Sequence, residues 1–277
     1  MIIYFLLLAA REPKVPISLP PVQADTLVEI KEGGRIDWTS MVIRAKGWAV
    51  IDTTGGKSYA QAKLMAIRGA KMVAYRNLLE IIQGVNVVSE TKVKDMTAKS
   101  DYIYTRIEGV VKGARMVGEP VEKDGIIEVE MEVSMYDSSG VAPVLWNELT
   151  KGKTLLMGAG AKVDEELKKV KSIIIDAGGT KAKPGFFPRI LDKNGNVLFD
   201  PSKYYKPGEY EFLIKYAKKA KETAEKLGVP ENSWVIKVLD AKGSDIIIED
   251  KDRGKIEKIK KGINFLIKAG KLIWMLL

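Results

Sequence analysis

Apolar and polar positions alternate along two stretches in the first half of the chain. In Ile127–Met135 every second residue is apolar, and the residues between them are three glutamates and a serine. This period of two, with one acidic side, predicts a half-buried strand. Met41–Ile51 has the same period, with Arg44, Lys46 and Trp48 on its polar side. Two strands are therefore expected to share one sheet.

A helical pattern lies between these two strands. Ser58 and Gln61 have the spacing of a capping box, and no proline follows before Gly84, which is expected to end the helix in a left-handed conformation. Every fourth position of this segment is alanine: Ala62, Ala66, Ala70 and Ala74. A ridge of small side chains lets a helix approach its neighbour closely. We predict that the ridge packs on the sheet; a seam between copies of the chain is the alternative.

Shorter elements complete this first region. Asp124-Gly125 is typical of a hairpin turn, and we expect Val110–Pro120 to be the partner of the strand that follows it. Val85–Val93 is predicted to be a strand and Thr97–Gly109 a short helix. The fold class is therefore α+β, a small sheet with one long Ala-rich helix.

The second half alternates strands with helices, which predicts a second α/β domain with a mixed sheet. An Asn-Gly pair in Lys193–Asn196 indicates a hairpin. The expected strands are Ser172–Ala177, Arg189–Asp192, Val197–Asp200, Trp234–Asp240, Asp245–Glu249 and the final LIWMLL. The expected helices are Glu209–Leu227 and Lys251–Ala269.

These elements divide the chain into four parts. Residues 1–34 are an apolar leader and a Pro-rich linker, 35–138 the α+β domain, 139–165 a linker and 166–277 the C-terminal α/β domain. The first ten residues, MIIYFLLLAA, are too few to span a bilayer and are similar to the core of a signal peptide, without its positively charged start. An apolar tail is the alternative.

The composition limits the chemistry. The 277 residues include no His and no Cys, which excludes His-based or Cys-based nucleophile systems, thiol redox chemistry and zinc sites built on these ligands. The net charge of +9 comes from lysines that share helices with acidic residues. This pattern favours solvated helix faces over a nucleic-acid site, and attraction to an anionic surface stays open. The composition favours a thermophilic source, because it has few glutamines and many Lys, Glu and Ile residues.

Five sequence blocks carry a resemblance to a known family. AKGWAVID, AYRNLLEIIQGV, VSETKVKDM, RIEGVVKGARMV and DGIIEVEMEVSM occur in this order within roughly residues 40–136. This region resembles the twenty-kilodalton-lipoprotein-like domain family of bacterial envelope and flagellar accessory proteins. The resemblance implies an envelope-associated domain that assembles into rings or discs and is not known for catalysis. Since the chain has no Cys, it departs from lipoprotein members that carry a lipid on an N-terminal Cys.

Two local motifs suggest other chemistry. Asp176–Thr180, followed by LDKNGNVLF, resembles the phosphate-gripping hairpin of sugar kinases, although that fold needs two lobes and a Pro-rich run interrupts the motif here. A glycine turn after a buried strand is the ordinary explanation. The acidic residues Glu249, Asp250 and Asp252 could bind a hard cation, but carboxylates that cap a helix explain them without a metal.

These observations lead to one functional hypothesis. We expect a non-enzymatic, secreted or periplasmic cell-envelope protein, a homo-oligomer that acts in self-assembly or in docking to an outer-membrane or flagellar accessory structure. No catalytic residue, cofactor, metal or nucleic acid is expected. The alternatives are a peptidoglycan- or glycan-binding module, with Trp38, Trp48 or Trp234 lining a groove, and a phosphotransfer enzyme at Asp176–Thr180.

Overall fold

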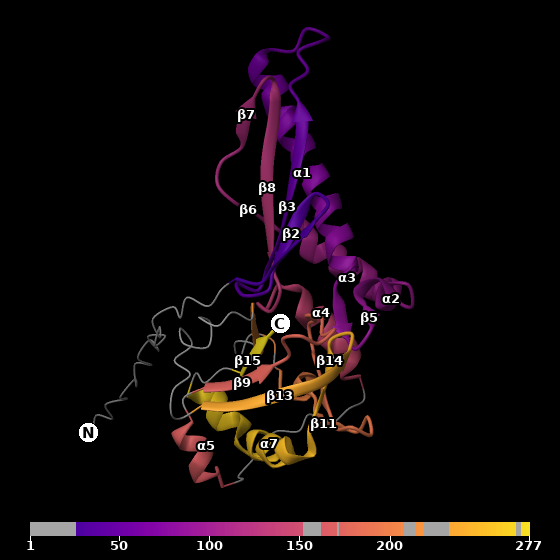
Figure 1. The fold of residues 1–277 in the computed structure, drawn as a ribbon. Coiled ribbons are helices and arrows are strands. Elements are labelled where there is room, and N and C mark those ends of the chain that lie inside the picture. The colour runs from indigo at the N-terminus through magenta and orange to yellow at the C-terminus, as the bar shows by residue number, and fades with distance from the viewer. Residues whose placement is uncertain are drawn as a thin grey trace, which may run out of the picture.

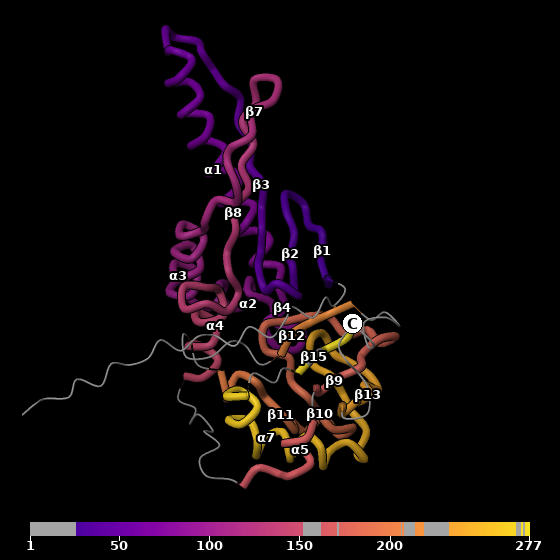
Figure 2. Tube along the Cα trace, turned by 90° about the vertical axis from the view of Figure 1, so that its left-hand side faces the viewer, coloured from indigo at the N-terminus to yellow at the C-terminus, as the bar shows by residue number. Residues whose placement is uncertain are grey.

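The chain forms two units joined by a broad junction. The computed structural model describes residues 26–151, 162–170, 172–205, 207, 214–218, 233–269 and 273–277. The first unit, residues 26–151, stands on the second, which comprises the described residues from 162 onward (Figures 1 and 2). Both units combine helices and strands, so the predicted α+β class is confirmed.

The first unit is one sheet with helices on one side. Its elements are β1 (Val28–Lys31), β2 (Gly34–Asp37), β3 (Val42–Val50), α1 (Tyr59–Gln83), β4 (Asn86–Val88), β5 (Thr91–Lys92), α2 (Val93–Thr97), α3 (Asp101–Lys112), β6 (Arg115–Met116), β7 (Val121–Lys123), β8 (Ile126–Ser134) and α4 (Val141–Leu149). The strand order is β1-β2-β3-β8-β6, and β7 also pairs with β8. β3 and β8 are antiparallel along their full lengths, so they form the spine of the unit.

Helix α1 packs directly on this spine through the predicted alanine ridge. All four alanines are buried, and the capping box of Ser58 and Gln61 starts the helix as predicted. Gly47 of β3 makes the approach possible, because a Cβ atom there would lie 2.1 Å from the carbonyl oxygen of Ala70. The ridge therefore serves packing within the unit.

Four local predictions for the first unit were wrong, in whole or in part. Gly84 is right-handed (φ −78°), because its N–H donates to helix carbonyls that include that of Ile81. Val85–Val93 contains two short strands, β4 and β5, around Ser89, which has φ +54°. Helix α3 occupies the start of the expected strand Val110–Pro120 and extends beyond the predicted helix. The expected pairing of Val110–Pro120 with β8 is confirmed only at β6, Arg115–Met116; the longest partner of β8 is β3, and the Asp-Gly turn joins β7 to β8.

The boundaries also differ from those expected. The range 1–34, expected to be leader and linker, includes β1, which pairs with β2. The expected linker 139–165 contains α4, whose apolar residues are buried. Buried residues of both units form one continuous hydrophobic cluster. The units therefore share a core across the junction.

The second unit is a seven-stranded mixed sheet, and Figure 1 shows α7 on the side of the sheet away from the first unit. Its elements are α5 (Glu165–Lys169), β9 (Ser172–Asp176), β10 (Ile190–Leu191), β11 (Val197–Phe199), η1 (Pro201–Lys203), β12 (Ile214–Ala217), β13 (Ser233–Lys242), β14 (Asp245–Ile248), η2 (Asp250–Asp252), α7 (Arg253–Lys268) and β15 (Ile273–Leu276). The order is β11-β10-β14-β13-β9-β15-β12.

Most predicted elements of this unit are present. The Asn-Gly hairpin joins β10 and β11, and Gly195 has φ +82° as its turn requires. The helix expected over Glu209–Leu227 was wrong at Ile214–Ala217, which form β12 parallel to β15. Much of the rest of that range lies outside the described residues. Pairing with a strand about sixty residues later in the chain overrides the local helical period here.

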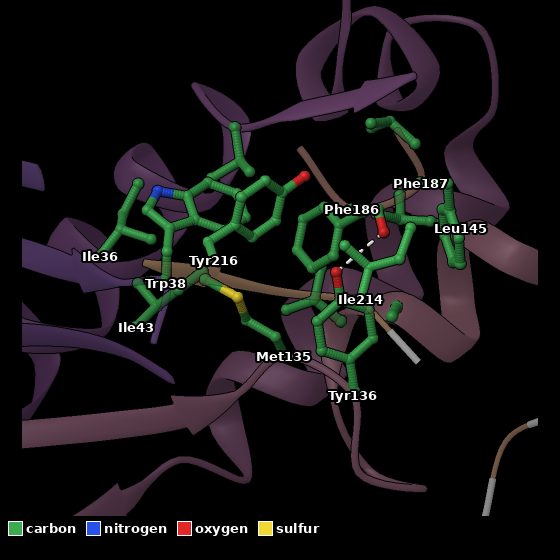
Figure 3. Close-up of a cluster of buried hydrophobic side chains, with 14 of the residues drawn as sticks. Ile36, Trp38, Ile43, Met135, Tyr136, Leu145, Phe186, Phe187, Ile214 and Tyr216 are labelled. Carbon is green, nitrogen blue, oxygen red and sulfur yellow. Dashed lines mark hydrogen bonds between the residues drawn. The ribbon is translucent and has the colours of Figure 1, made fainter. Parts of the chain in front are cut away.

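Aromatic side chains from both units meet at the junction (Figure 3). Trp38 of the first unit contacts Phe186 and Tyr216 edge-to-face, with ring centroids 6.4 and 5.3 Å apart. The Tyr136 hydroxyl donates a hydrogen bond of 2.8 Å to the Phe186 carbonyl, and the Tyr205 hydroxyl donates to the Tyr136 carbonyl. Phe186 is fully buried. The Pro-rich run at 184–188 thus holds the units together.

A second set of contacts uses the turn between β4 and β5. The backbone N–H groups of Phe186 and Phe187 donate to the carbonyls of Asn86 and Val87, at 2.9 and 2.8 Å. The carboxylate of Asp245, which is buried, accepts hydrogen bonds from the N–H of Ser89 and from Arg189. Backbone hydrogen bonds and the hydrogen bond from Ser89 to the buried Asp245 therefore fix the orientation of the two units.

Candidate functional site

The face of the first sheet opposite α1, here called the open face, carries the most distinctive surface of the molecule. Along β3, Ile43 and Ala45 point toward α1, so Arg44, Lys46, Trp48 and Val50 point to the open face. On β8 the even-numbered residues 126–132 lie opposite them. Basic side chains from β2, β3 and β6 therefore face glutamates on β8.

Ion pairs neutralise the part of the open face nearer the junction. Arg35 bonds to Glu130 at 2.6 Å, and Lys46 bonds to Glu128 at 2.7 Å. Glu132, only 3% exposed, accepts hydrogen bonds from Arg115 and from the Nε of Arg44, the latter at 2.5 Å. Burial alone would raise the pKa of the Glu132 carboxyl, but the two guanidinium groups outweigh it and hold this pKa below 4.5.

A lowered pKa of Glu132 in the folded state links this group to acid stability. Its contribution is complete above about pH 4.5, the pKa of a free glutamate, and is lost as the pH falls through the lower folded value. We expect Glu132→Gln to lower the free energy of unfolding by about 1–3 kcal/mol at pH 7, and by less at pH 3. Urea denaturation at both pH values measures this. An equal loss at both would contradict the assignment.

The end of the open face that is farthest from the second unit is apolar. Trp48 and Val121 lie on either side of Glu128 in adjacent strands, and Val50 lies opposite Ile126. Trp48 is 61% exposed, Val50 and Val121 are each 60% exposed, and Ile126 is partly exposed. We call these four residues the apolar tip. Figure 1 shows this end of β3 and β8 well away from the second unit.

The strand β7 is held beside the tip by contacts to α1 on the opposite face. Glu122 accepts a hydrogen bond from the Tyr59 hydroxyl and pairs with Lys63 at 2.9 Å. These hydrogen bonds lower the pKa of Glu122. Val121 is thereby turned to the open face, since successive side chains of a strand alternate. The tip is a surface on three paired strands.

The residues expected on the polar side of β3 differ in their contacts. Trp48 is exposed as predicted, whereas Arg44 and Lys46 are engaged by glutamates of the same sheet. Val121 and Ile126 were missed. Ile126 shares the period of two with Glu128 and Glu130. The two-residue Asp-Gly turn fixes the pairing of β7 with β8, and this pairing places Val121 on the same face of the sheet as Ile126. Both could have been found from this register.

The three tryptophans expected to line a groove do not share one surface. Trp38 is 1% exposed and belongs to the junction, where its Nε1 donates to Glu29 at 2.9 Å. Trp234 lies on β13 of the second unit, with the Lys258 ammonium 5.9 Å from its ring centroid. Trp48 is at the apolar tip. The buried Trp38 cannot contribute to a glycan-binding groove.

The Asp176–Thr180 segment forms hydrogen bonds between its own residues. The Asp176 carboxylate accepts the N–H of Gly178 at 3.1 Å, and the Thr180 hydroxyl donates to the Ala177 carbonyl at 2.7 Å. Gly179 has φ +86°, as a tight turn requires. These contacts are those of a glycine turn after a buried strand.

Glu249 and Asp252, two of the three acidic residues before α7, are paired with lysines. Glu249 pairs with Lys251, and the Oδ1 of Asp252 lies 2.7 Å from the Lys255 Nζ. Neither carboxylate makes the capping hydrogen bond that we expected. Within the described residues, no group of three or more acidic side chains is arranged to hold a metal ion. The described helices also include none long and apolar enough to cross a bilayer.

Comparison with known proteins finds one family model on this chain. A model described as the second domain of Treponema pallidum Tp0624 matches residues 172–276. This range runs from β9 to β15 and so contains every strand of the second sheet. The chain therefore includes a domain similar to one from a bacterial protein. No curated protein matches the chain.

Proposed function

We propose that this chain is a non-enzymatic protein of the bacterial cell envelope, periplasmic or secreted, that acts by self-association and by docking to an envelope structure. The apolar tip is its contact surface, and the second unit anchors it and contacts a neighbour. The observation that carries the proposal is the contrast on the open face. Its charges are neutralised within the sheet, while four apolar side chains at its far end are left exposed.

Physical reasoning favours association at this place. Single exposed apolar residues are normal, but a contiguous apolar group rimmed by polar residues marks an interaction surface. An exposed tryptophan within such a group is typical of the residues that contribute most to binding. The rigid junction supports the same role, since a tip held at a fixed distance from the second unit can set the geometry of an assembly.

One likeness supports the envelope setting, and a second supports a bacterial protein. Residues 40–136 resemble the twenty-kilodalton-lipoprotein-like domain, whose members are envelope or flagellar accessory proteins. The model on residues 172–276 comes from a bacterial protein. Fractionation of the cells that produce the chain, with an antibody against it, tests the location. Recovery with the envelope is expected, and recovery in the cytosol would contradict this part of the proposal.

Removing the apolar tip should weaken self-association. We expect the double variant Trp48→Ser, Val121→Ser to associate about tenfold or more weakly than the natural chain, because it loses two apolar side chains from the contact. Light scattering over a concentration series measures this. The matched control is Val197→Ser, which changes an exposed valine on β11 of the second unit. Equal association of the natural chain and the tip variant would contradict the role of the tip.

A further inference from the structure

The edge of the first sheet offers a second contact surface. Strand β1 is the last strand on its side, and the described residues include no strand on its outer edge. β1 pairs with β2 across the two-residue turn Glu32–Gly33, so Lys31 lies opposite Gly34 and Ile30 opposite Arg35. The direction of each backbone group of β1 follows from this register.

One hydrogen bond and the alternation of the ladder fix which residues of β1 bond inward. The N–H of Trp38 donates to the Leu27 carbonyl at 2.9 Å, and the pairing alternates along an antiparallel ladder. Leu27, Glu29 and Lys31 therefore bond toward β2. The N–H and C=O groups of Val28 and Ile30 point away from the sheet.

This edge has only part of the usual protection against pairing. Natural edge strands are protected by a bulge, a proline, charged side chains or a short length; β1 is short and carries Glu29 and Lys31, but it contains no proline and its register with β2 is regular. Ile30 is 78% exposed, the highest value among the large apolar side chains of the described residues. Val28 is also exposed. An extended strand could add here with both backbone and apolar contacts.

We propose that two copies of this chain pair through β1, antiparallel and centred on Ile30. In this register the Ile30 N–H of each copy donates to the Ile30 carbonyl of the other, and the two Ile30 side chains lie side by side. Glu29 of one copy faces Lys31 of the other, twice across the two-fold axis. Opposite charges placed in this way stabilise a strand pair.

The charges also argue for a second copy and against neighbouring registers. A pair centred on Glu29 would place two glutamates opposite each other, and one centred on Lys31 would place two lysines opposite each other. Like charges directly opposite destabilise a strand pair. Glu29 and Lys31 already attract each other within one chain, at 2.7 Å. β1 thus carries both the acidic and the basic residue that two identical antiparallel strands need to pair with each other.

The pairing joins two sheets into one continuous sheet. Four residues bury much less than the roughly 1,200 Å² of a stable interface, so this contact alone is weak. It becomes effective where other contacts, such as the apolar tip, hold several copies together. The inference therefore rests on the proposed role in self-association, and it adds the arrangement of the copies.

Cross-linking tests the arrangement directly. The chain has no Cys, so Ile30→Cys introduces a single thiol at the proposed two-fold axis. A pair of Cα atoms in this register is about 5.5 Å apart, which a disulfide can bridge. We expect Ile30→Cys to give cross-linked dimer on oxidation and the control Val197→Cys to give little. Equal yields from the two variants would overturn the proposal.

A proline variant separates this inference from the proposed function. Ile30→Pro removes the outward N–H and leaves the hydrogen bonds of Glu29 and Lys31 to β2 intact, so the fold should be kept. The melting temperature checks this. We expect association to weaken about tenfold, since two hydrogen bonds across the axis are lost. If the natural chain associates and Ile30→Pro associates equally well, the β1 pairing is wrong and the function stands. If the natural chain stays monomeric at every concentration, both fail.

Discussion

Replacing Phe186 by alanine is expected to lower the free energy of unfolding by about 3–5 kcal/mol, the usual cost of truncating a fully buried aromatic side chain. Phe186 is fully buried between the two units, where it contacts Trp38 and Tyr136. The loss should therefore appear as lower stability of the whole molecule. Urea denaturation followed by tryptophan fluorescence measures it, because Trp38 reports on the same junction.

The control for this experiment is Tyr102→Ala on α3. Tyr102 is an exposed aromatic residue, so its truncation should change the stability by no more than about 0.5 kcal/mol. One unfolding transition is expected for the natural chain, since its buried residues form one cluster. Two well-separated transitions, or a loss below about 1 kcal/mol for Phe186→Ala, would contradict a shared core.

The second large effect is expected at Gly47. A Cβ atom there would lie 2.1 Å from the Ala70 carbonyl oxygen and 2.4 Å from the Ala74 nitrogen, both backbone atoms of α1. Gly47→Ala must therefore push the helix away from β3 along the alanine ridge. We expect a loss of about 3 kcal/mol, toward the upper end of the cost of overpacking a core. Thermal or urea unfolding measures this.

Gly109→Ala is the matched control for Gly47. Gly109 lies within α3, and a Cβ atom there would meet no atom within 4 Å. The same glycine-to-alanine change should therefore stabilise the chain by about 0.5–1 kcal/mol. Effects of the same sign and size at both positions would show that α1 does not approach β3 as closely as described.

The sequence predicted best the elements whose signals are local. The capping box of Ser58 and Gln61 and the four alanines placed α1 within one residue, because caps and helical periodicity are signals between neighbours along the chain. The alternation in Ile127–Met135 identified β8 for a similar reason. The turns at Asp124-Gly125 and Asn194-Gly195 need positive φ angles, which few residue types adopt readily.

Elements whose stability comes from distant contacts were missed. Val85–Val93 was predicted to be one strand, but it forms two short strands, β4 and β5, which are held by a hydrogen bond from Ser89 to Asp245 and by the backbone of Phe186 and Phe187. Residues 184–188 contain two prolines, and the sequence predicted only that they interrupt the kinase-like motif. Nothing in the local pattern shows that Phe186 packs against Trp38 and Phe187 against Tyr205. The junction therefore depends on contacts between residues far apart in the chain, such as Trp38 and Tyr216.

The candidate site was predicted in part. The period of β3 placed Trp48 on the polar side of the strand, but it could not distinguish Trp48 from Arg44. The difference comes from the register of β3 with β8, which places glutamates within reach of Arg44 and Lys46. The exposure of the apolar tip therefore depends on how the strands pair, which the sequence of one strand does not show.

Hydrogen–deuterium exchange of the intact chain at low and high protein concentration tests the central claim most directly. The claim is that the surfaces of the first sheet act by association. On concentration, we expect slower exchange at the N–H groups of Val28 and Ile30 and in the segments around the apolar tip, with little change at the exposed β11. Identical exchange at both concentrations in all of these segments would contradict the account.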